Sequence, residues 1–351
     1  MDSISRVTAE WPSSGLEAVS VCPLCGTAER SLAHAGLRDY FFASAPGSWS
    51  MWQCHRCGSG YLDPRPTRQS IAIAYSRYYT HQPNEFRSNK GLRRLWYALR
   101  EDYLQAEFGV RSEHALWPGR WLLRLFPIGR RGLDAALARN LDSPPVSGGR
   151  LLDVGCGNGD FVGFAMRAGW LARGIDNDPI AVAAAHARCL DVVEGTLDLF
   201  DDESACYDRI TLSHVLEHVY DPWKMLSQCH RLLKPGGVLW LETPNMNARG
   251  HSAFGPYWRG LEPPRHLQLF SRALLVGKLA EQGFTDIEER FSSFATAAMW
   301  RESQEIMKKA GVGRQLRHSW IGQLFAEVEA LLAEDSREFI TLVCVKKNDR
   351  Q

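Results

Sequence analysis

The sequence has 351 residues, enough for two domains and a small third module at about 150 residues per domain. Hydrophobic residues make up 45% of the chain, and no apolar run reaches the roughly 18 residues of a membrane span, which argues against an integral membrane protein. Lysine and arginine (41) nearly balance aspartate and glutamate (40). The whole chain therefore lacks the positive charge that drives non-specific binding to nucleic acid.

Two pairs of cysteines near the N-terminus form C-x-x-C-Gly knuckles, which together supply the four thiolates of a closed zinc site. The N-terminal segment lacks the pattern of a secretory signal, so we expect a cytoplasmic protein with reduced cysteines. Free thiols or a redox pair are the alternatives, but a redox C-x-x-C motif normally accompanies a βαβ pattern, which is missing around these cysteines. Residues 1–66 are predicted to form a zinc-ribbon-like module with the ligands Cys22, Cys25, Cys54 and Cys57.

The next segment, residues 67–147, has apolar residues at three- and four-residue spacing, which predicts a helical cap. Ten basic residues and four acidic ones lie between Arg87 and Arg131, so this stretch is locally positive. Within it, residues 117–126 mix aromatic, aliphatic and arginine side chains as a segment at a membrane surface would. A cap that packs on its own protein is the simpler interpretation, and peripheral membrane contact is the alternative.

From residue 148 to 351, short strand-like runs alternate with helical ones, which predicts βαβ units and a parallel sheet. The last two runs would form an antiparallel edge, with an amphipathic helical insertion at about residues 294–334 between them. The predicted strands are 151–154, 171–175, 191–195, 207–212, 238–242, 285–291 and 338–345.

A glycine-rich turn follows the first of these strands and opens a helix. Its glycines let backbone amides approach a ligand closely at the helix N-terminus. The spacing G-x-G-x-G is shorter than the G-x-G-x-x-G of dinucleotide sites, and Asp153 lies two residues before the first glycine. A carboxylate there would repel a pyrophosphate but suits a cationic amino group. Asp176, at the end of the second strand, is placed to accept both hydroxyls of a ribose.

In combination these motifs resemble the class I S-adenosylmethionine-dependent methyltransferases over about residues 148–291, with the final strand added. The resemblance implies a Rossmann-like mixed seven-stranded sheet with helices on both faces. It also implies that the segment 153–159 holds the methionine part of S-adenosylmethionine, that Asp176 binds the ribose and that residues 196–197 flank the adenine. The family often has an acid at or near the position of Thr196, and position 196 itself is threonine here. The expected cofactor-binding residues are Asp153, Gly155, Cys156, Gly157, Gly159, Asp176, Asn177, Thr196, Leu197, Ser213 and His214.

The chain also resembles a narrower group in which paired knuckles and a Pro-Arg-Pro linker precede the transferase domain. Its members include sugar and natural-product methyltransferases. The resemblance therefore implies an enzyme that methylates a small-molecule or glycosyl acceptor, such as a sugar, a glycan precursor or a natural product. The acceptor itself, the methylated atom and the oligomeric state are not fixed by the sequence.

Methyl transfer to a hydroxyl or carbon acid requires a proton acceptor, most often histidine, beyond the carboxyl ends of the strands. Four histidines qualify by position: His214, His218, His251 and His266. The stretch 245–271 shows little secondary-structure signal and is too long for an idle connection, so we interpret it as the acceptor loop. The expected catalytic residues are His266 as base, His218, Tyr257, and Arg265 as a contact for a phosphate.

Two other functions remain open. An RNA methyltransferase of the guanine type is the first, because some of these enzymes place a zinc module before the same fold and because the stretch 87–131 is rich in arginine. The near-zero net charge argues against it. A non-catalytic scaffold that binds zinc and S-adenosylmethionine is the second, although the intact glycine turn and both acids favour an enzyme.

Overall fold

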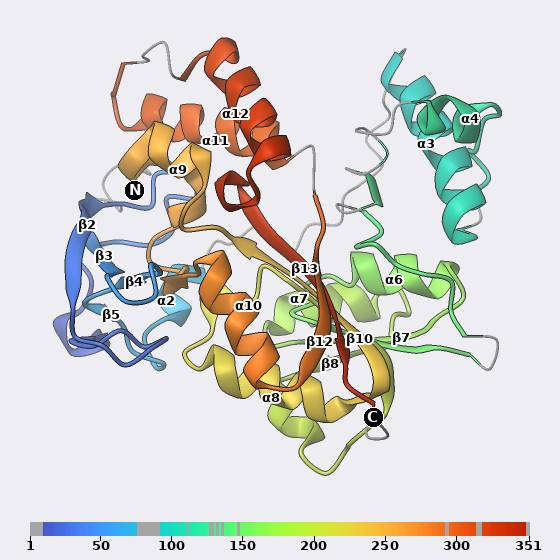
Figure 1. Cartoon of the computed structure of the whole chain (residues 1–351), viewed down its shortest axis with the longest axis horizontal. Coiled ribbons are helices and arrows are strands. Elements are labelled where there is room, and N and C mark those ends of the chain that lie inside the picture. The colour runs from blue at the N-terminus through green and yellow to red at the C-terminus, as the bar shows by residue number, and fades with distance from the viewer. Residues whose placement is uncertain are drawn as a thin grey trace.

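The computed structural model describes residues 10–75, 92–110, 112–125, 130, 133–134, 137–145, 148–291, 295–313 and 318–348. A seven-stranded sheet with the order β12-β13-β10-β9-β6-β7-β8 forms its centre (Figure 1). The five strands from β10 to β8 are parallel, whereas β13 is antiparallel to both β10 and β12, so the predicted mixed sheet is confirmed. The strands are β6 (Arg150–Val154), β7 (Leu171–Asp176), β8 (Val192–Glu194), β9 (Tyr207–Ser213), β10 (Leu233–Pro244), β12 (Phe284–Glu289) and β13 (Phe339–Lys346).

Helices cover both faces of this sheet because successive side chains of each strand point to opposite sides. On β6, Leu152 and Val154 pack in one apolar cluster with residues of α8 and α10, whereas Leu151 packs in another with residues of α6 and α7. Four helices pack on the sheet, and three of them begin after a short polar capping residue. The side chain of the residue before α7, α8 and α10 accepts hydrogen bonds from backbone amides of the first helical turn. These helices are α6 (Asp160–Arg167), α7 (Pro179–His186), α8 (Pro222–Leu232) and α10 (Arg272–Glu281).

The N-terminal module contains a second, four-stranded sheet with the order β11-β4-β3-β2. Three of its strands come from the module, but β11 (Gln268–Leu269) comes from the stretch after β10 and pairs antiparallel with β4. The module and the larger domain are therefore joined by backbone hydrogen bonds. The module's elements are η1 (Ser13–Gly15), β1 (Leu16–Glu17), β2 (Arg30–Leu37), β3 (Trp49–Cys54), β4 (Gly60–Leu62) and β5 (Arg65–Pro66), with β1 paired to β5.

The stretch 245–271 differs from the expected acceptor loop with little secondary structure. It forms α9 (Arg249–Phe254), the short turns η5 (Gly255–Tyr257) and η6 (Arg259–Leu261), and β11. Its apolar side chains, including those of Trp258, Leu261 and Phe270, are buried against the module and the sheet. Burial of these side chains holds the segment in one place, a tertiary effect that its sequence pattern did not indicate.

Helices from two other regions complete the described structure. The predicted cap contains α2 (Ala72–Tyr75), α3 (Leu92–Phe108) and α4 (Gly119–Arg124), and part of the arginine-rich stretch 87–131 lies outside the described residues. The expected insertion forms α11 (Ala295–Lys309) and α12 (Trp320–Leu332), followed by the turn η8 (Glu334–Ser336). Within the described residues, no helix combines the length and the apolar character that crossing a membrane requires.

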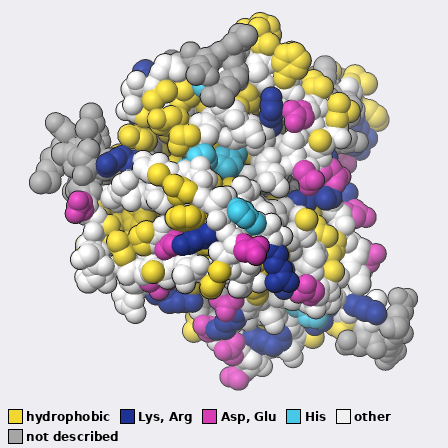
Figure 2. Space-filling view, turned by 60° about the vertical axis from the view of Figure 1, so that its left-hand side comes forward, with side chains coloured by type: hydrophobic (Ala, Val, Ile, Leu, Met, Phe, Trp, Pro, Cys, Tyr) yellow, Lys and Arg dark blue, Asp and Glu magenta, His cyan; other side chains and the backbone are white. Residues whose placement is uncertain are grey.

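Charged side chains of both signs are mixed on the face of the molecule shown in Figure 2. This agrees with the formal net charge of +1. On the hairpin of α3 and α4, the side chains of Trp117, Trp121 and Leu125 are exposed, as an interfacial segment would require.

Candidate functional site

The glycine turn after β6 adopts a conformation that glycine favours. Gly155, Gly157 and Gly159 have φ angles of +67°, +55° and +76°, in the left-handed region that other residues rarely adopt. A Cβ atom added to Gly157 would meet no heavy atom within 4 Å, so the turn is open at its centre. Cys156, between Gly155 and Gly157, is buried, and its Sγ atom packs against Gly174 of β7. The turn thus presents backbone rather than side chains to a ligand.

Asp153 is the second-last residue of β6, just before this turn, and its side chain is fully buried. Its Oδ1 atom accepts hydrogen bonds from Thr211 Oγ1, at 2.7 Å, and from Arg139. Its Oδ2 atom has no hydrogen-bond partner among the described residues. Burial raises the pKa of Asp153, an effect that Arg139 and Thr211 oppose. A buried oxygen without a partner is costly, and the ammonium group of a bound ligand would satisfy it.

Asp176 ends β7 and is held by two backbone amides. Its Oδ2 atom accepts from Gly157 N at 2.7 Å and its Oδ1 atom accepts from Asp178 N at 2.9 Å. The carboxylate is therefore fixed beside the glycine turn. Asn177 directly follows β7, Thr196 lies two residues after β8, and both residues are exposed.

Leu197 and Ser213 complete the expected cofactor positions. Leu197 begins the turn η3 (Leu197–Phe200), and its side chain is buried in the apolar core. Ser213 is the last residue of β9. The unpartnered Asp153 oxygen, the open turn and the fixed Asp176 carboxylate together fit S-adenosylmethionine, which presents an ammonium group and a ribose.

A cluster of histidines and glutamates lies at the end of β9, in and around the turn η4 (Leu216–His218). Glu217 is fully buried, and its carboxylate contacts His214 Nδ1 at 3.2 Å and accepts from Thr243 Oγ1 at 2.9 Å. His214 has a φ of +54° and also lies 3.4 Å from a carboxylate oxygen of Glu242. Burial would lower the pKa of His214, but its hydrogen bonds to Glu217 and Glu242 outweigh that effect and raise it to about 10. His214 therefore carries a positive charge near pH 7.

His218 and His266 meet on the other side of Glu217. Their ring centroids are 4.7 Å apart and the ring planes cross at 71°. His218 Nδ1 lies 3.0 Å from the carbonyl oxygen of Arg265, and His266 Nδ1 lies 2.7 Å from that of Gly260. His218 Nδ1 also lies 3.1 Å from the hydroxyl of Tyr75. Burial lowers the pKa of His266 to about 4, so its ring is neutral near pH 7.

That low pKa counts against the expected role of His266 as a general base, because a base is most effective when its pKa is near the working pH. His251 is engaged elsewhere. Its Nε2 atom lies 2.7 Å from Nε2 of His34 in β2, and its ring stacks on Trp258. His251 thus joins α9 to the N-terminal module.

Arg265 does not fit the expected role of a phosphate contact. It is fully buried, and its guanidinium donates hydrogen bonds to both carboxylate oxygens of Asp39, at 2.8 and 3.0 Å, and to Glu262 at 2.9 Å. These carboxylates already neutralise the side chain, which ties the N-terminal module to the larger domain. Tyr257 is half-buried against the apolar cluster between the module and α9.

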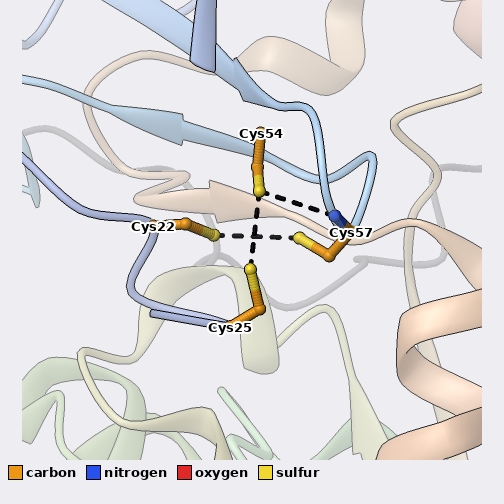
Figure 3. Close-up of side chains that lie close together, drawn as sticks. All are labelled: Cys22, Cys25, Cys54 and Cys57. Carbon is orange, nitrogen blue, oxygen red and sulfur yellow. Dashed lines mark hydrogen bonds between the residues drawn. The ribbon is translucent and has the colours of Figure 1, made fainter. Parts of the chain in front are cut away.

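The four predicted metal ligands converge in the N-terminal module. Their sulfur atoms point toward one another from the two knuckles, as Figure 3 shows. Cys22 Sγ and Cys57 Sγ are 3.7 Å apart, and Cys25 Sγ and Cys54 Sγ are 3.5 Å apart. Four sulfurs around one zinc ion, each about 2.3 Å from it, would be about 3.8 Å apart. The donor set and its spacing therefore fit a structural zinc ion.

Sequence reasoning missed Arg139, Thr211 and Glu217. Glu217 lies between two predicted histidines in the run His214-Val-Leu-Glu-His218, so a search for mixed ligand patterns would have found it. Thr211 and Arg139 reach Asp153 from β9 and from the segment before β6. Sequence offered no signal for these two contacts, because they depend on how the segment before β6 packs on the sheet.

Residues 125–289 match a family model described as "Methyltransferase domain". The chain is 37% identical over 155 residues to a ubiquinone biosynthesis O-methyltransferase of Xanthomonas oryzae pv. oryzae (strain PXO99A), covering 42% of this chain and 58% of the relative. The protein of the same name from Actinobacillus pleuropneumoniae serotype 5b is 37% identical over 115 residues, covering 30% of this chain and 49% of the relative. The chain thus spans about half the length of the curated relatives it matches.

Among solved structures, a SAM dependent methyltransferase from Archaeoglobus fulgidus is similar, with a TM-score of 0.43 and 19% identity. The similarity covers 64% of this chain and 99% of that one. The family match, together with the strand order of the sheet, confirms the resemblance to class I methyltransferases for the domain that carries the sheet.

Proposed function

We propose that this chain, which carries a methyltransferase domain, transfers a methyl group from S-adenosylmethionine to a hydroxyl oxygen of a small-molecule acceptor. One observation carries the proposal. Asp153 of β6 pairs in register with Thr211 of β9, two residues before the end of that strand. The cofactor-binding features after β6 and the histidine cluster after β9 therefore share one edge of the sheet, where open α/β sheets bind ligands.

Each end of this site has a distinct task in the proposal. Asp153 binds the ammonium group of the cofactor, and Asp176 accepts hydrogen bonds from its ribose beside the open glycine turn. The bound cofactor supplies an electrophilic methyl group. The protein's contribution is to align the acceptor oxygen with that methyl group, because alignment alone removes several kcal/mol from the barrier.

The cluster of Glu217, His218 and His266 is the proposed acceptor end. There the acceptor hydroxyl gives up its proton to water as the methyl group is transferred. The O-methyltransferases among the relatives support oxygen as the methylated atom and a small molecule as the acceptor. Hydroxylated aromatic compounds, sugars and natural products are the classes to assay first.

We further infer that Cys22, Cys25, Cys54 and Cys57 hold a structural zinc ion. The sulfur spacing and the closed donor set support this, since four thiolates leave no position open for a substrate. The ion would hold the first knuckle, which lies between β1 and β2, against the second, which joins β3 to β4.

The cofactor assignment is tested by binding of S-adenosylhomocysteine. We expect saturating S-adenosylhomocysteine to raise the melting temperature of the protein. Asp176→Ala removes charge-assisted hydrogen bonds to the ribose, so calorimetry should show at least a tenfold loss of affinity. Asp202→Asn, an exposed acid in a turn, is the control that should bind normally. An unchanged melting temperature of the wild-type protein, or equal affinities of the two variants, would contradict the proposal.

A further inference from the structure

We propose that Glu217, His218 and His266 form a second metal site that binds a divalent transition-metal ion, zinc in the first instance. The three residues offer one carboxylate oxygen and two imidazole nitrogens, and these atoms lie within 4.8 Å of one another. The ion would lie at the acceptor end of the site. Its place next to the acceptor hydroxyl rests on the proposed function, whereas the binding of the metal does not.

The orientation of the two imidazole rings supports the site. A histidine that binds a metal through one nitrogen usually donates the N–H of its other nitrogen to a carbonyl or carboxylate oxygen. Both rings have this arrangement, because Nδ1 of His218 faces the carbonyl oxygen of Arg265 and Nδ1 of His266 faces that of Gly260. With the protons on Nδ1, both Nε2 atoms carry lone pairs. Within the described residues, the hydrogen bonds of these two rings are all made at Nδ1.

The third ligand is also held in place. Glu217 is buried, and its two carboxylate oxygens are fixed by His214 and Thr243. Each carboxylate oxygen can accept more than one bond, so these contacts leave capacity for a metal. Hydrogen bonds to neighbouring groups thus hold all three proposed ligands in place, as in established metal centres.

The nearest competitor for His266 is Glu262, and it is already neutralised. Oε2 of Glu262 lies 3.8 Å from Nε2 of His266, beyond the length of a hydrogen bond. Arg259 and Arg265 instead hold the Glu262 carboxylate. The Nε2 atom of His266 is therefore not committed to this acid.

The donor set indicates the kind of ion. Two histidines and one glutamate are the ligands of zinc sites that keep a fourth position open for water or substrate, at bond lengths of about 2.0–2.2 Å. The three side chains would draw together when the ion binds. This set differs from the four sulfurs of the N-terminal module, which leave no open position.

The open position gives the ion a role in methyl transfer. A hydroxyl oxygen held there becomes more acidic, because a divalent cation stabilises the alkoxide or phenolate. The O–H bond breaks and its proton passes to water. The acceptor oxygen then forms the new C–O bond while the S–CH₃ bond breaks, with its electron pair remaining on the sulfur of S-adenosylhomocysteine.

The test is the metal content of the full-length protein, measured by mass spectrometry after dialysis against zinc. We expect two zinc ions for each wild-type chain, one of them in the four-cysteine site. His266→Ala should bind one, whereas His114→Ala, a change at an exposed histidine outside the cluster, should bind two. One ion in the wild-type protein, or two in His266→Ala, would overturn the proposal.

A measurement on the wild-type chain guards against a variant that fails to fold. Titration with Co²⁺ alone should fill a thiolate site with strong sulfur-to-metal charge-transfer absorption and a second site without it. Absence of the second spectral component would refute the metal site. Since S-adenosylhomocysteine binding is measured separately, a chain that binds the cofactor product but one metal ion contradicts this inference alone. The reverse result contradicts the proposed function alone.

Discussion

Arg265 connects the two parts of the molecule through a single buried side chain. Its guanidinium pairs with Asp39 of the N-terminal module and with Glu262 of its own segment. Burial of ions is costly, but these charges compensate one another and their hydrogen bonds are satisfied. Removing the cation would leave the Asp39 carboxylate buried without its arginine, whereas Glu262 would keep Arg259 beside it.

We therefore expect Arg265→Met to lower the free energy of unfolding by about 3–5 kcal/mol, the range typical for breaking a buried ion pair. Denaturation in urea would measure it. Arg301→Met is the matched control, because the Arg301 side chain is 76% exposed and its removal should change stability by less than about 0.5 kcal/mol. Similar losses of unfolding free energy in both variants would show that the buried ion pairs of Arg265 stabilise the protein no more than an exposed arginine does.

At this scale, sequence predicted the residues that carry a local signature. Asp153 and the three glycines could be proposed as cofactor-binding residues because their spacing along one turn is itself a sequence signature. The pairing of Arg265 with Asp39 was not found, since these residues are more than 200 positions apart and meet only after folding. From sequence alone, an arginine beside a histidine and aromatic residues suggests a ligand-binding residue. Only the folded structure shows that carboxylates already neutralise Arg265.

Helices α3 and α4 cross at a glycine. A Cβ atom on Gly119 would lie 2.0 Å from the carbonyl oxygen of Leu99, so only glycine allows this approach. Asp102 of α3 fixes the same crossing by accepting hydrogen bonds from the backbone and side chain of Arg120. The hairpin therefore depends on close backbone contact and one ion pair.

Gly119→Ala should destabilise the protein by about 1–3 kcal/mol, because the added methyl group forces the helices apart. Gly277→Ala makes the same chemical change at an exposed position of α10, where a Cβ atom meets nothing within 4 Å. There we expect a gain of about 0.5–1 kcal/mol from the better helix propensity of alanine. Melting temperatures that move in the same direction for both variants would contradict this account.

Sequence predicted most elements of the larger domain because the strands and helices carry their own periodicity and three of the helices also carry capping residues. The prediction failed for β11, which is two residues long and has no pattern of its own. Its partner β4 lies about 200 positions earlier in the chain, and nothing local to either strand indicates the pairing.

On the scale of the whole molecule, a histidine pair makes the contact between the N-terminal module and α9 sensitive to pH. Burial, together with the nearby His251, lowers the pKa of His34 to about 4. In the unfolded chain His34 takes up a proton near pH 6.5. Between pH 6.5 and 4 the unfolded state therefore binds more protons at this residue than the folded state does. The contribution of His34 to stability is therefore full above about pH 6.5 and is lost as the pH falls toward 4.

We expect the free energy of unfolding to decrease between pH 6.5 and 4, and to decrease less in His34→Gln, which removes the titrating group. Urea denaturation at several pH values measures both slopes. His114→Gln, at an exposed histidine, should retain the wild-type slope. Parallel pH profiles of the wild-type protein and His34→Gln would contradict the assignment.

The pairing of β11 with β4 also sets an order of assembly during synthesis. The N-terminal sheet needs Gln268 and Leu269 for its fourth strand, so it cannot be completed until about 200 residues after β4 have left the ribosome. Contacts between residues so distant in sequence form slowly, because a long loop must close first. In the interval the edge of β4 lacks its partner, and a nascent chain is then most open to pairing with the wrong strand.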